Sequence, residues 1–130
     1  MLALTVDFDS EVPVYRQIVE EIRGLIARGQ LTDGSELPSV RQLGARIGIN
    51  QNTVARAYRL LSDEGLVDLR HGSRAKVRIA DAPYRDTNDD ADRRLHDVIS
   101  RWVLAGESRR SIERRFAEAL DRFFAAQVTR

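Results

Sequence analysis

The sequence SVRQLGARIGINQNTVARAYRLLSDEG, residues 39–65, predicts two amphipathic helices joined by a tight turn. Ser39, with Gln42 three residues later, matches the capping box that begins a helix. Gly48 suits the left-handed residue that ends this helix, and Asn50 is a good N-cap for the next one. Apolar residues recur at helical spacing in both segments, at Val40, Leu43 and Ile47 and at Val54, Ala57, Tyr58 and Leu61. Two helices joined by a short turn that contains glycine are typical of a helix-turn-helix.

A further helix is predicted before this pair, and two strands are predicted after it. Pro13 suits the first position of a helix, and Gly29 suits its end. Between them, apolar residues recur at helical spacing, at Val14, Ile18, Ile22, Leu25 and Ile26. Apolar and polar residues alternate on either side of a turn, in residues 66–70 and 76–79. This alternation predicts a two-stranded ribbon, or wing. Residues 11–80 therefore predict a winged helix.

The rest of the sequence predicts a linker followed by two helices. Residues 81–90 contain Pro83 and a run of Asn and Asp, and residues 91–130 contain two amphipathic segments separated by Gly106, with Ser108 as a cap. This part of the chain contains Trp102 and three of the four Phe residues. A lone helical hairpin cannot bury that much aromatic surface, so it must pack on the rest of the chain or on a second copy of itself. The residues expected to serve dimerisation are Leu95, Val98, Ile99, Trp102, Ile112, Phe116, Leu120 and Phe123.

These elements define the expected fold class and domain organisation. The chain is mostly α with a small β-wing, and it is built as a winged helix-turn-helix head plus a two-helix C-terminal dimerisation tail. We expect residues 1–80 to form the head, residues 81–90 the linker and residues 91–130 the helical dimerisation tail.

The composition excludes several classes of protein. The 130 residues are 42% hydrophobic and 32% charged, which is typical of a globular chain, and they include no cysteine for a disulfide or a thiolate zinc site. No apolar run approaches the length of a membrane span, and the N-terminus does not resemble a signal peptide, so we expect a cytoplasmic protein with no membrane partner. His71 and His96 have no partners at metal or catalytic-triad spacing, and no catalytic or cofactor motif is present. We therefore expect no enzyme activity and no cofactor.

Charge is distributed unevenly along the chain, although the net charge is only +1. Residues 38–79 contain seven Arg and one Lys against three acidic residues, whereas residues 1–37 and 81–92 are acidic. A central basic block is what binding to a polyanion requires, and it is also compatible with an ordinary solvated surface.

The outer face of the helix after Asn50 carries side chains that can read DNA bases. Asn52, Arg56 and Arg59 follow one stripe because residues i, i+4 and i+7 share a helix face. Asn and Gln can bond an adenine edge and Arg a guanine edge, and the first turn of a recognition helix enters the major groove. The alternative is a solvated face in which Asn50 is only a cap and Arg59 pairs with Asp63.

Residues outside this helix are expected to contact the DNA backbone or the minor groove. Ser39 and Arg41 begin the helix that crosses the backbone, although Ser39 also suits a cap and Arg41 an ion pair with an acid such as Glu20. The basic turn at residues 71–74 suits the tip of the wing. The full set of predicted DNA-binding residues is Ser39, Arg41, Asn50, Gln51, Asn52, Thr53, Arg56, Arg59, His71, Gly72 and Arg74.

Four segments resemble the winged-helix head of GntR-family bacterial transcriptional regulators. They are PVYRQI (13–18), LPSVRQL (37–43), NQNTVARAY (50–58) and EGLV (64–67). The short tail is similar to that of the YtrA-type subfamily, whose helical tail serves dimerisation. The resemblance implies a homodimeric repressor of palindromic operators, with DNA contacts at Arg41, Asn52, Thr53, Arg56 and Gly72. The family wing commonly reads Gly-x-Gly-Thr, whereas Gly72 is followed here by Ser-Arg-Ala, and the missing second glycine makes the tip stiffer and bulkier.

The main expectation is therefore a sequence-specific DNA-binding transcriptional regulator that represses a (pseudo)palindromic double-stranded DNA operator as a homodimer. One alternative is a winged-helix protein-interaction scaffold that does not bind nucleic acid. Another is a truncated fusion, which the capped amphipathic tail disfavours. No segment resembles an effector-binding domain, so the sequence identifies no effector ligand.

Overall fold

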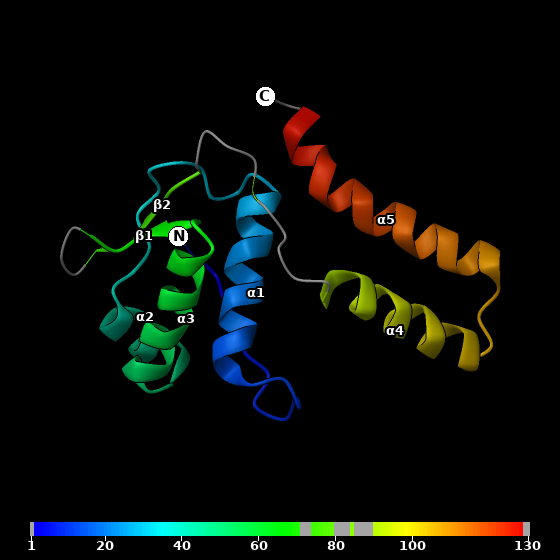
Figure 1. Ribbon diagram of the computed structural model, residues 1–130, viewed down its shortest axis with the longest axis horizontal. Coiled ribbons are helices and arrows are strands. Elements are labelled where there is room, and N and C mark those ends of the chain that lie inside the picture. The colour runs from blue at the N-terminus through cyan, green and yellow to red at the C-terminus, as the bar shows by residue number, and fades with distance from the viewer. Residues whose placement is uncertain (1, 71–73, 80–83, 85–89, 129–130) are drawn as a thin grey trace. The chain divides into compact units, whose positions relative to one another are not determined.

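The computed structural model describes residues 2–70, 74–79, 84 and 90–128, and the chain divides into two compact units, Met1–Pro83 and Tyr84–Arg130. The first unit contains α1 (Val14–Ala27), α2 (Val40–Ile47), α3 (Gln51–Asp63), β1 (Val67–Asp68) and β2 (Lys76–Val77), and the second contains α4 (Asp90–Leu104) and α5 (Arg109–Val128) (Figure 1). The predicted fold class is confirmed: the chain is mostly helical, with a winged helix-turn-helix and a small antiparallel sheet.

The local signals that begin and end α2 and α3 act as predicted. The Ser39 hydroxyl oxygen accepts a hydrogen bond from the Gln42 backbone N–H at 3.1 Å, and the Gln42 side chain accepts one from the Ser39 N–H at 3.0 Å, which completes a capping box. Gly48 ends α2 at a φ of 73°. Asn50 caps α3, because its side-chain oxygen accepts from the Asn52 N–H at 2.8 Å.

The start of α1 differs by one residue from the prediction. Pro13 was expected as the first helical residue, but the helix begins at Val14 and Pro13 occupies the capping position with an extended ψ of 145°. The Pro13 carbonyl accepts from the backbone N–H groups of Arg16 and Gln17, so Pro13 still closes the first turn. Gly29, at a φ of 77°, follows the end of α1 as expected.

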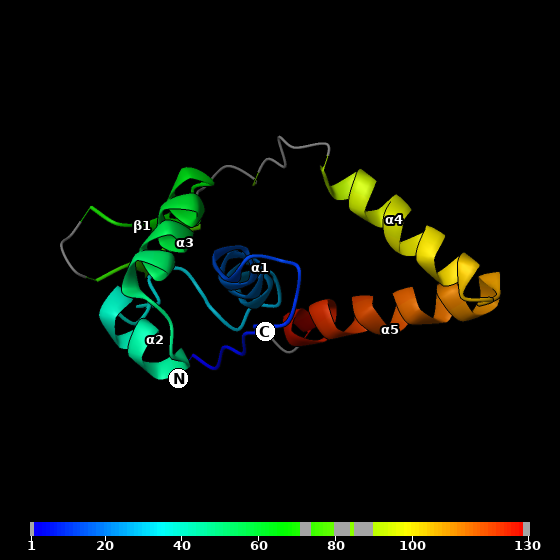
Figure 2. The same ribbon diagram turned by 90° about the horizontal axis from the view of Figure 1, so that it is seen from below.

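The core of the first unit forms where α1 and α2 pack against α3 (Figure 2). Tyr58 is buried in this core, and its hydroxyl donates to the Pro38 carbonyl oxygen at 2.7 Å. Leu4 is also buried in this core, a contribution from the N-terminal segment that the sequence analysis missed. The largest fully buried side chains are Tyr58, Ile18, Ile22, Leu43, Leu61, Val54 and Val77. This packing leaves the opposite face of α3 open to solvent.

The wing strands are shorter than predicted, and the connector before α2, residues 34–37, pairs with β2. Each strand has two residues, and Val67 pairs with Val77 in antiparallel register. The Ser35 backbone carbonyl accepts a hydrogen bond from the Val77 N–H at 2.8 Å. The Leu37 N–H donates to the Ala75 carbonyl, also at 2.8 Å. Residues 34–37 therefore extend the ribbon on its second side, which the sequence analysis did not predict.

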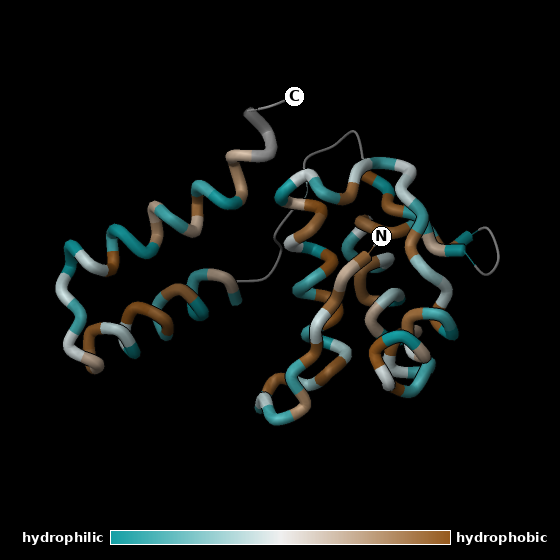
Figure 3. The backbone as a smooth tube through the Cα atoms, turned by 180° about the vertical axis from the view of Figure 1, so that it is seen from behind, coloured by the Kyte–Doolittle hydropathy of each residue, from teal (hydrophilic) through white to brown (hydrophobic). Residues whose placement is uncertain are grey.

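The second unit is a helical hairpin. Gly106, at a φ of 88°, lies between the helices, and the Ser108 hydroxyl accepts from the Ser111 N–H at 3.1 Å and caps α5 as predicted. Apolar and polar stretches alternate along α4 (Figure 3). Asp90, expected as the last linker residue, is instead the first residue of α4. Its carboxylate pairs with Arg94 one turn later at 2.8 Å, and a negative charge at a helix N-terminus is favourable.

Candidate nucleic-acid interface

The first turn of α3 presents two side-chain amides to solvent. Gln51 and Asn52 are exposed, and neither side chain hydrogen-bonds a residue that the structure describes. Thr53, the next residue, is half-buried. The Asn50 side chain is already used as the cap of α3, so its expected contact with DNA competes with an interaction inside the protein. Gln51 and Asn52 are therefore the predicted residues whose donors and acceptors remain open.

A groove of about 850 Å³ lies beside this turn, between α2, α3 and the wing. Four of the predicted DNA-binding residues line it, namely Ser39, Arg41, Gln51 and Arg74. Arg46 also lines it. This residue is not among the predicted DNA-binding residues, although its place on the exposed side of α2 was a usable signal. Glu36 also lines the groove and pairs with Arg74, so three arginines against one carboxylate leave a net positive charge that favours an anion.

Arg41 is available for such an anion. It is exposed, and it makes no ion pair with any residue that the structure describes, so the predicted alternative of a bond to Glu20 is not found. Ser39 holds the cap of α2 with its hydroxyl oxygen, while its hydroxyl proton can still be donated. The capped N-terminus of α2 adds a positive partial charge at the same place.

The one described residue of the predicted wing tip is held by an internal partner. Arg74 pairs with Glu36 of the connector at 3.2 Å, and both side chains are largely exposed. An exposed ion pair of this kind contributes about 0–1 kcal/mol, so a phosphate can replace the carboxylate. His71 and Gly72 lie outside the described residues.

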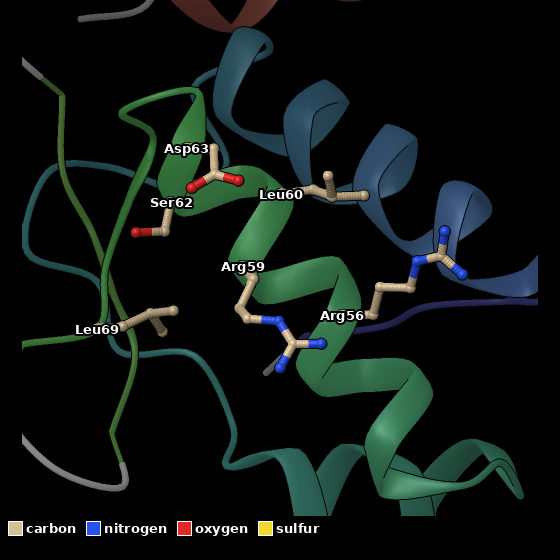
Figure 4. A pocket seen from close by; sticks show the side chains of 6 residues that line it. All are labelled: Arg56, Arg59, Leu60, Ser62, Asp63 and Leu69. Atoms are coloured by element: carbon tan, nitrogen blue, oxygen red, sulfur yellow. The ribbon is translucent and has the colours of Figure 1, made fainter.

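Two arginines of α3 extend in different directions (Figure 4). The Arg56 guanidinium lies over the Tyr15 ring of α1, 3.8 Å from the ring centroid. Arg59 leaves the helix in another direction and makes no ion pair with Asp63 or with any other described residue, so that alternative is also not found. Both arginines line a shallow depression of about 330 Å³ along the outside of α3.

A metal-binding cluster and a membrane-spanning helix are two further features that would bear on the function of the described part of the chain. Within residues 2–70, 74–79, 84 and 90–128, no three His, Asp or Glu side chains gather as metal ligands. In the same residues, no helix is both long and apolar enough to cross a membrane.

The fold and this basic, amide-bearing surface define a winged helix-turn-helix protein. The sequence pattern of a family described as "Bacterial regulatory proteins, gntR family" matches residues 14–77. The solved structure of YtrA from Sulfolobus acidocaldarius, a GntR-family transcription factor, is 30% identical, covers 91% of this chain and 97% of its own, and superposes with a TM-score of 0.56. The chain therefore belongs to the GntR family, and the family pattern falls on its winged helix-turn-helix.

Two further relatives concern this domain in particular. The transcriptional repressor YtrA of Bacillus subtilis is 38% identical over 69 residues, which are 53% of this chain and 53% of that protein. The chain thus matches about half the length of this curated relative. The structure of the AraR DNA-binding domain in complex with operator ORX1 is 26% identical, with a TM-score of 0.52, and covers 59% of this chain and 99% of its own.

Proposed function

We propose that the whole protein is a sequence-specific transcriptional regulator that represses genes by binding a (pseudo)palindromic operator as a homodimer in the cytoplasm. The observation that carries this proposal is the first turn of α3, where Gln51 and Asn52 point open amides into solvent beside a groove with three arginines. The AraR domain, a structural relative of the first unit, was solved on operator DNA.

In this proposal α3 enters the major groove and reads sequence from its N-terminal end. The amide of Asn52 or Gln51 can donate to and accept from one adenine edge, a contact worth about 1–3 kcal/mol of discrimination. Arg41, Ser39 and the backbone N–H groups at the start of α2 then hold a phosphate and fix the register of α3. Arg74 exchanges its bond with Glu36 for a second phosphate.

The α4–α5 hairpin supports the homodimer. Trp102 and Phe116 pack edge to face at 5.6 Å and Ile112 is buried, so these residues hold the hairpin together. Phe123 is half-buried on α5. The other residues expected to serve dimerisation, Leu95, Val98, Ile99 and Leu120, remain exposed within this unit. A second hairpin related by a two-fold axis would cover such a face, and a two-fold dimer matches a palindromic operator.

Binding of the purified full-length protein to duplex DNA tests the proposal. An operator is first selected from a library of duplexes with about 30 random base pairs, long enough for two half-sites. Affinity for this operator should fall steeply with salt, by about 0.9 log unit per log unit of salt for each phosphate neutralised. No enrichment of any sequence, with only weak binding that does not depend on salt, would favour the protein-interaction scaffold instead.

A further inference from the structure

The stacked pair formed by Tyr15 and Arg56 joins α1 to the outer side of α3. Tyr15 lies in the first turn of α1 and is half-buried, whereas Arg56 is exposed. The guanidinium lies 3.8 Å from the centre of the ring. No carboxylate in the described part of the chain pairs with Arg56, so its positive charge is not neutralised there.

Stacking holds a guanidinium without using its hydrogen-bond donors. The ring occupies one flat face, while the five N–H groups lie in the plane and point outward from its edge. A free arginine loses much rotamer entropy when it binds, and a side chain already held on a ring loses less. Tyr15 therefore presents Arg56 in a fixed orientation to an anion with two acceptor oxygens, such as the two non-bridging oxygens of a phosphate.

The position of the pair indicates which part of DNA it meets. The groove beside the wing is lined by Gln51 but not by Arg56, which instead contacts α1 (Figure 4). Arg56 therefore lies toward a flank of α3, away from the groove that leads to the wing. A helix in the major groove has base edges beneath it and a phosphate backbone along each flank.

We infer that Arg56 binds a backbone phosphate on the α1 side of the recognition helix and that Tyr15 is the residue that positions it. This inference rests on the proposed function, and it replaces the expected guanine contact of Arg56 with a contact that carries no sequence information. Reading of bases is then left to Gln51 and Asn52. The competing explanation is that the stack only fastens α1 to α3.

The test compares Arg56→Ala with the unaltered full chain on the selected operator and on duplexes that each carry one altered base pair. A lost phosphate contact lowers affinity by a similar factor on every duplex, by about tenfold or more, and reduces the salt slope by about one. If Arg56 read a base, discrimination would instead disappear at one position, and that result would overturn the inference.

The role of Tyr15 is tested with a conservative and a disruptive substitution. Tyr15→Phe keeps the ring, so its affinity and salt slope should match those of the unaltered chain. Tyr15→Leu keeps an apolar side chain but removes the ring, and affinity should fall by about twofold to fivefold with a smaller salt slope. Equal melting temperatures of the two variants show that the first unit is folded. An unchanged affinity for Tyr15→Leu would overturn the inference.

A double-mutant cycle shows whether Tyr15 acts through Arg56. If it does, Tyr15→Leu has no further effect on DNA affinity once Arg56→Ala is present. An equal loss in both backgrounds means that Tyr15 affects DNA binding independently of Arg56, and it overturns the inference. A stack that only fastens the helices would instead lower the melting temperature of Tyr15→Leu and leave the salt slope unchanged, and that result also overturns the inference. Arg56→Lys keeps the positive charge at this position. The salt slope of DNA binding by this variant should therefore equal that of the unaltered chain. Failure of the unaltered chain to bind DNA would instead contradict the proposed function.

Discussion

Two asparagines at the start of α3 have different surroundings although they are two residues apart. The Asn50 side chain accepts the Asn52 N–H and caps the helix, whereas the Asn52 side chain makes no bond with a described residue. The first residue is therefore important for folding, and the second is free for recognition.

The first prediction compares these two positions. Asn52→Ala should leave the melting temperature unchanged but relax base preference at one operator position by about 1–3 kcal/mol. Asn50→Ala is the matched control, and it should lower the free energy of unfolding by about 1 kcal/mol because the cap is lost. Urea titration and binding to single-base operator variants measure both effects. Intact discrimination by Asn52→Ala would exclude Asn52 as a base-reading residue.

The second prediction concerns Tyr58 in the core. Burial raises the pKa of Tyr58 well above its usual range, and the nearby Arg46 lowers it by a smaller amount. Because the folded protein holds this proton more tightly than the unfolded chain, the contribution of Tyr58 is complete below about pH 10, the ordinary tyrosine pKa, and is lost as the pH rises further.

Tyr58→Phe isolates this contribution. The variant should be about 1 kcal/mol less stable at neutral pH because the bond to the Pro38 carbonyl is lost. Its free energy of unfolding should then fall less steeply above about pH 10 than that of the unaltered chain. Equal slopes in urea titrations across this pH range would show that the Tyr58 proton does not contribute.

At the scale of elements, the sequence predicts features that depend on nearby residues. The structure confirms the predicted caps of α2 and α3 and the predicted apolar face of α3. Each of these features depends on side chains only a few positions apart in the sequence. The pairing of residues 34–37 with the wing could not be predicted, since it is made by backbone groups and leaves no pattern of side chains in the sequence. The stack of Tyr15 on Arg56 depends on how α1 crosses α3, and periodicity does not specify a crossing.

The third prediction separates the two roles of the α2 cap. Ser39→Ala should cost about 1 kcal/mol of stability, whereas Ser39→Asp should keep the cap and the stability of the unaltered chain. Ser39→Asp also places a negative charge in the groove that contains Arg41, so DNA affinity should fall. Thermal melting and DNA titration measure the two effects. Undiminished affinity of the Asp variant would place the DNA away from this groove.

At the scale of the whole molecule, the open apolar face of the α4–α5 hairpin is the feature that the proposed dimer explains. Leu120 keeps 55% of its surface exposed within this unit, and Leu95, Val98 and Ile99 of α4 are also exposed. Their periodicity indicates an amphipathic hairpin, but no feature of one chain specifies which surface covers it.

The fourth prediction tests this covering. Leu120→Asp should convert the dimer to a monomer in sedimentation, and affinity for the full operator should fall by about 100-fold or more because the second half-site no longer adds to binding. Arg114→Asp is the matched control, since it places the same carboxylate on the opposite, polar side of α5 and should leave the dimer intact. A dimer that survives Leu120→Asp would contradict the assignment.

The pairing of residues 34–37 with the wing also limits how this protein can change during evolution. These backbone hydrogen bonds do not depend on side-chain identity, so an exposed position such as Glu36 can change, whereas Leu37 is buried in the core and Gly34 has a φ of 85° that favours glycine. A one-residue insertion or deletion would shift the pairing by one position and turn each following side chain to the other face. Natural variants of this segment should therefore differ at its exposed positions but keep its length.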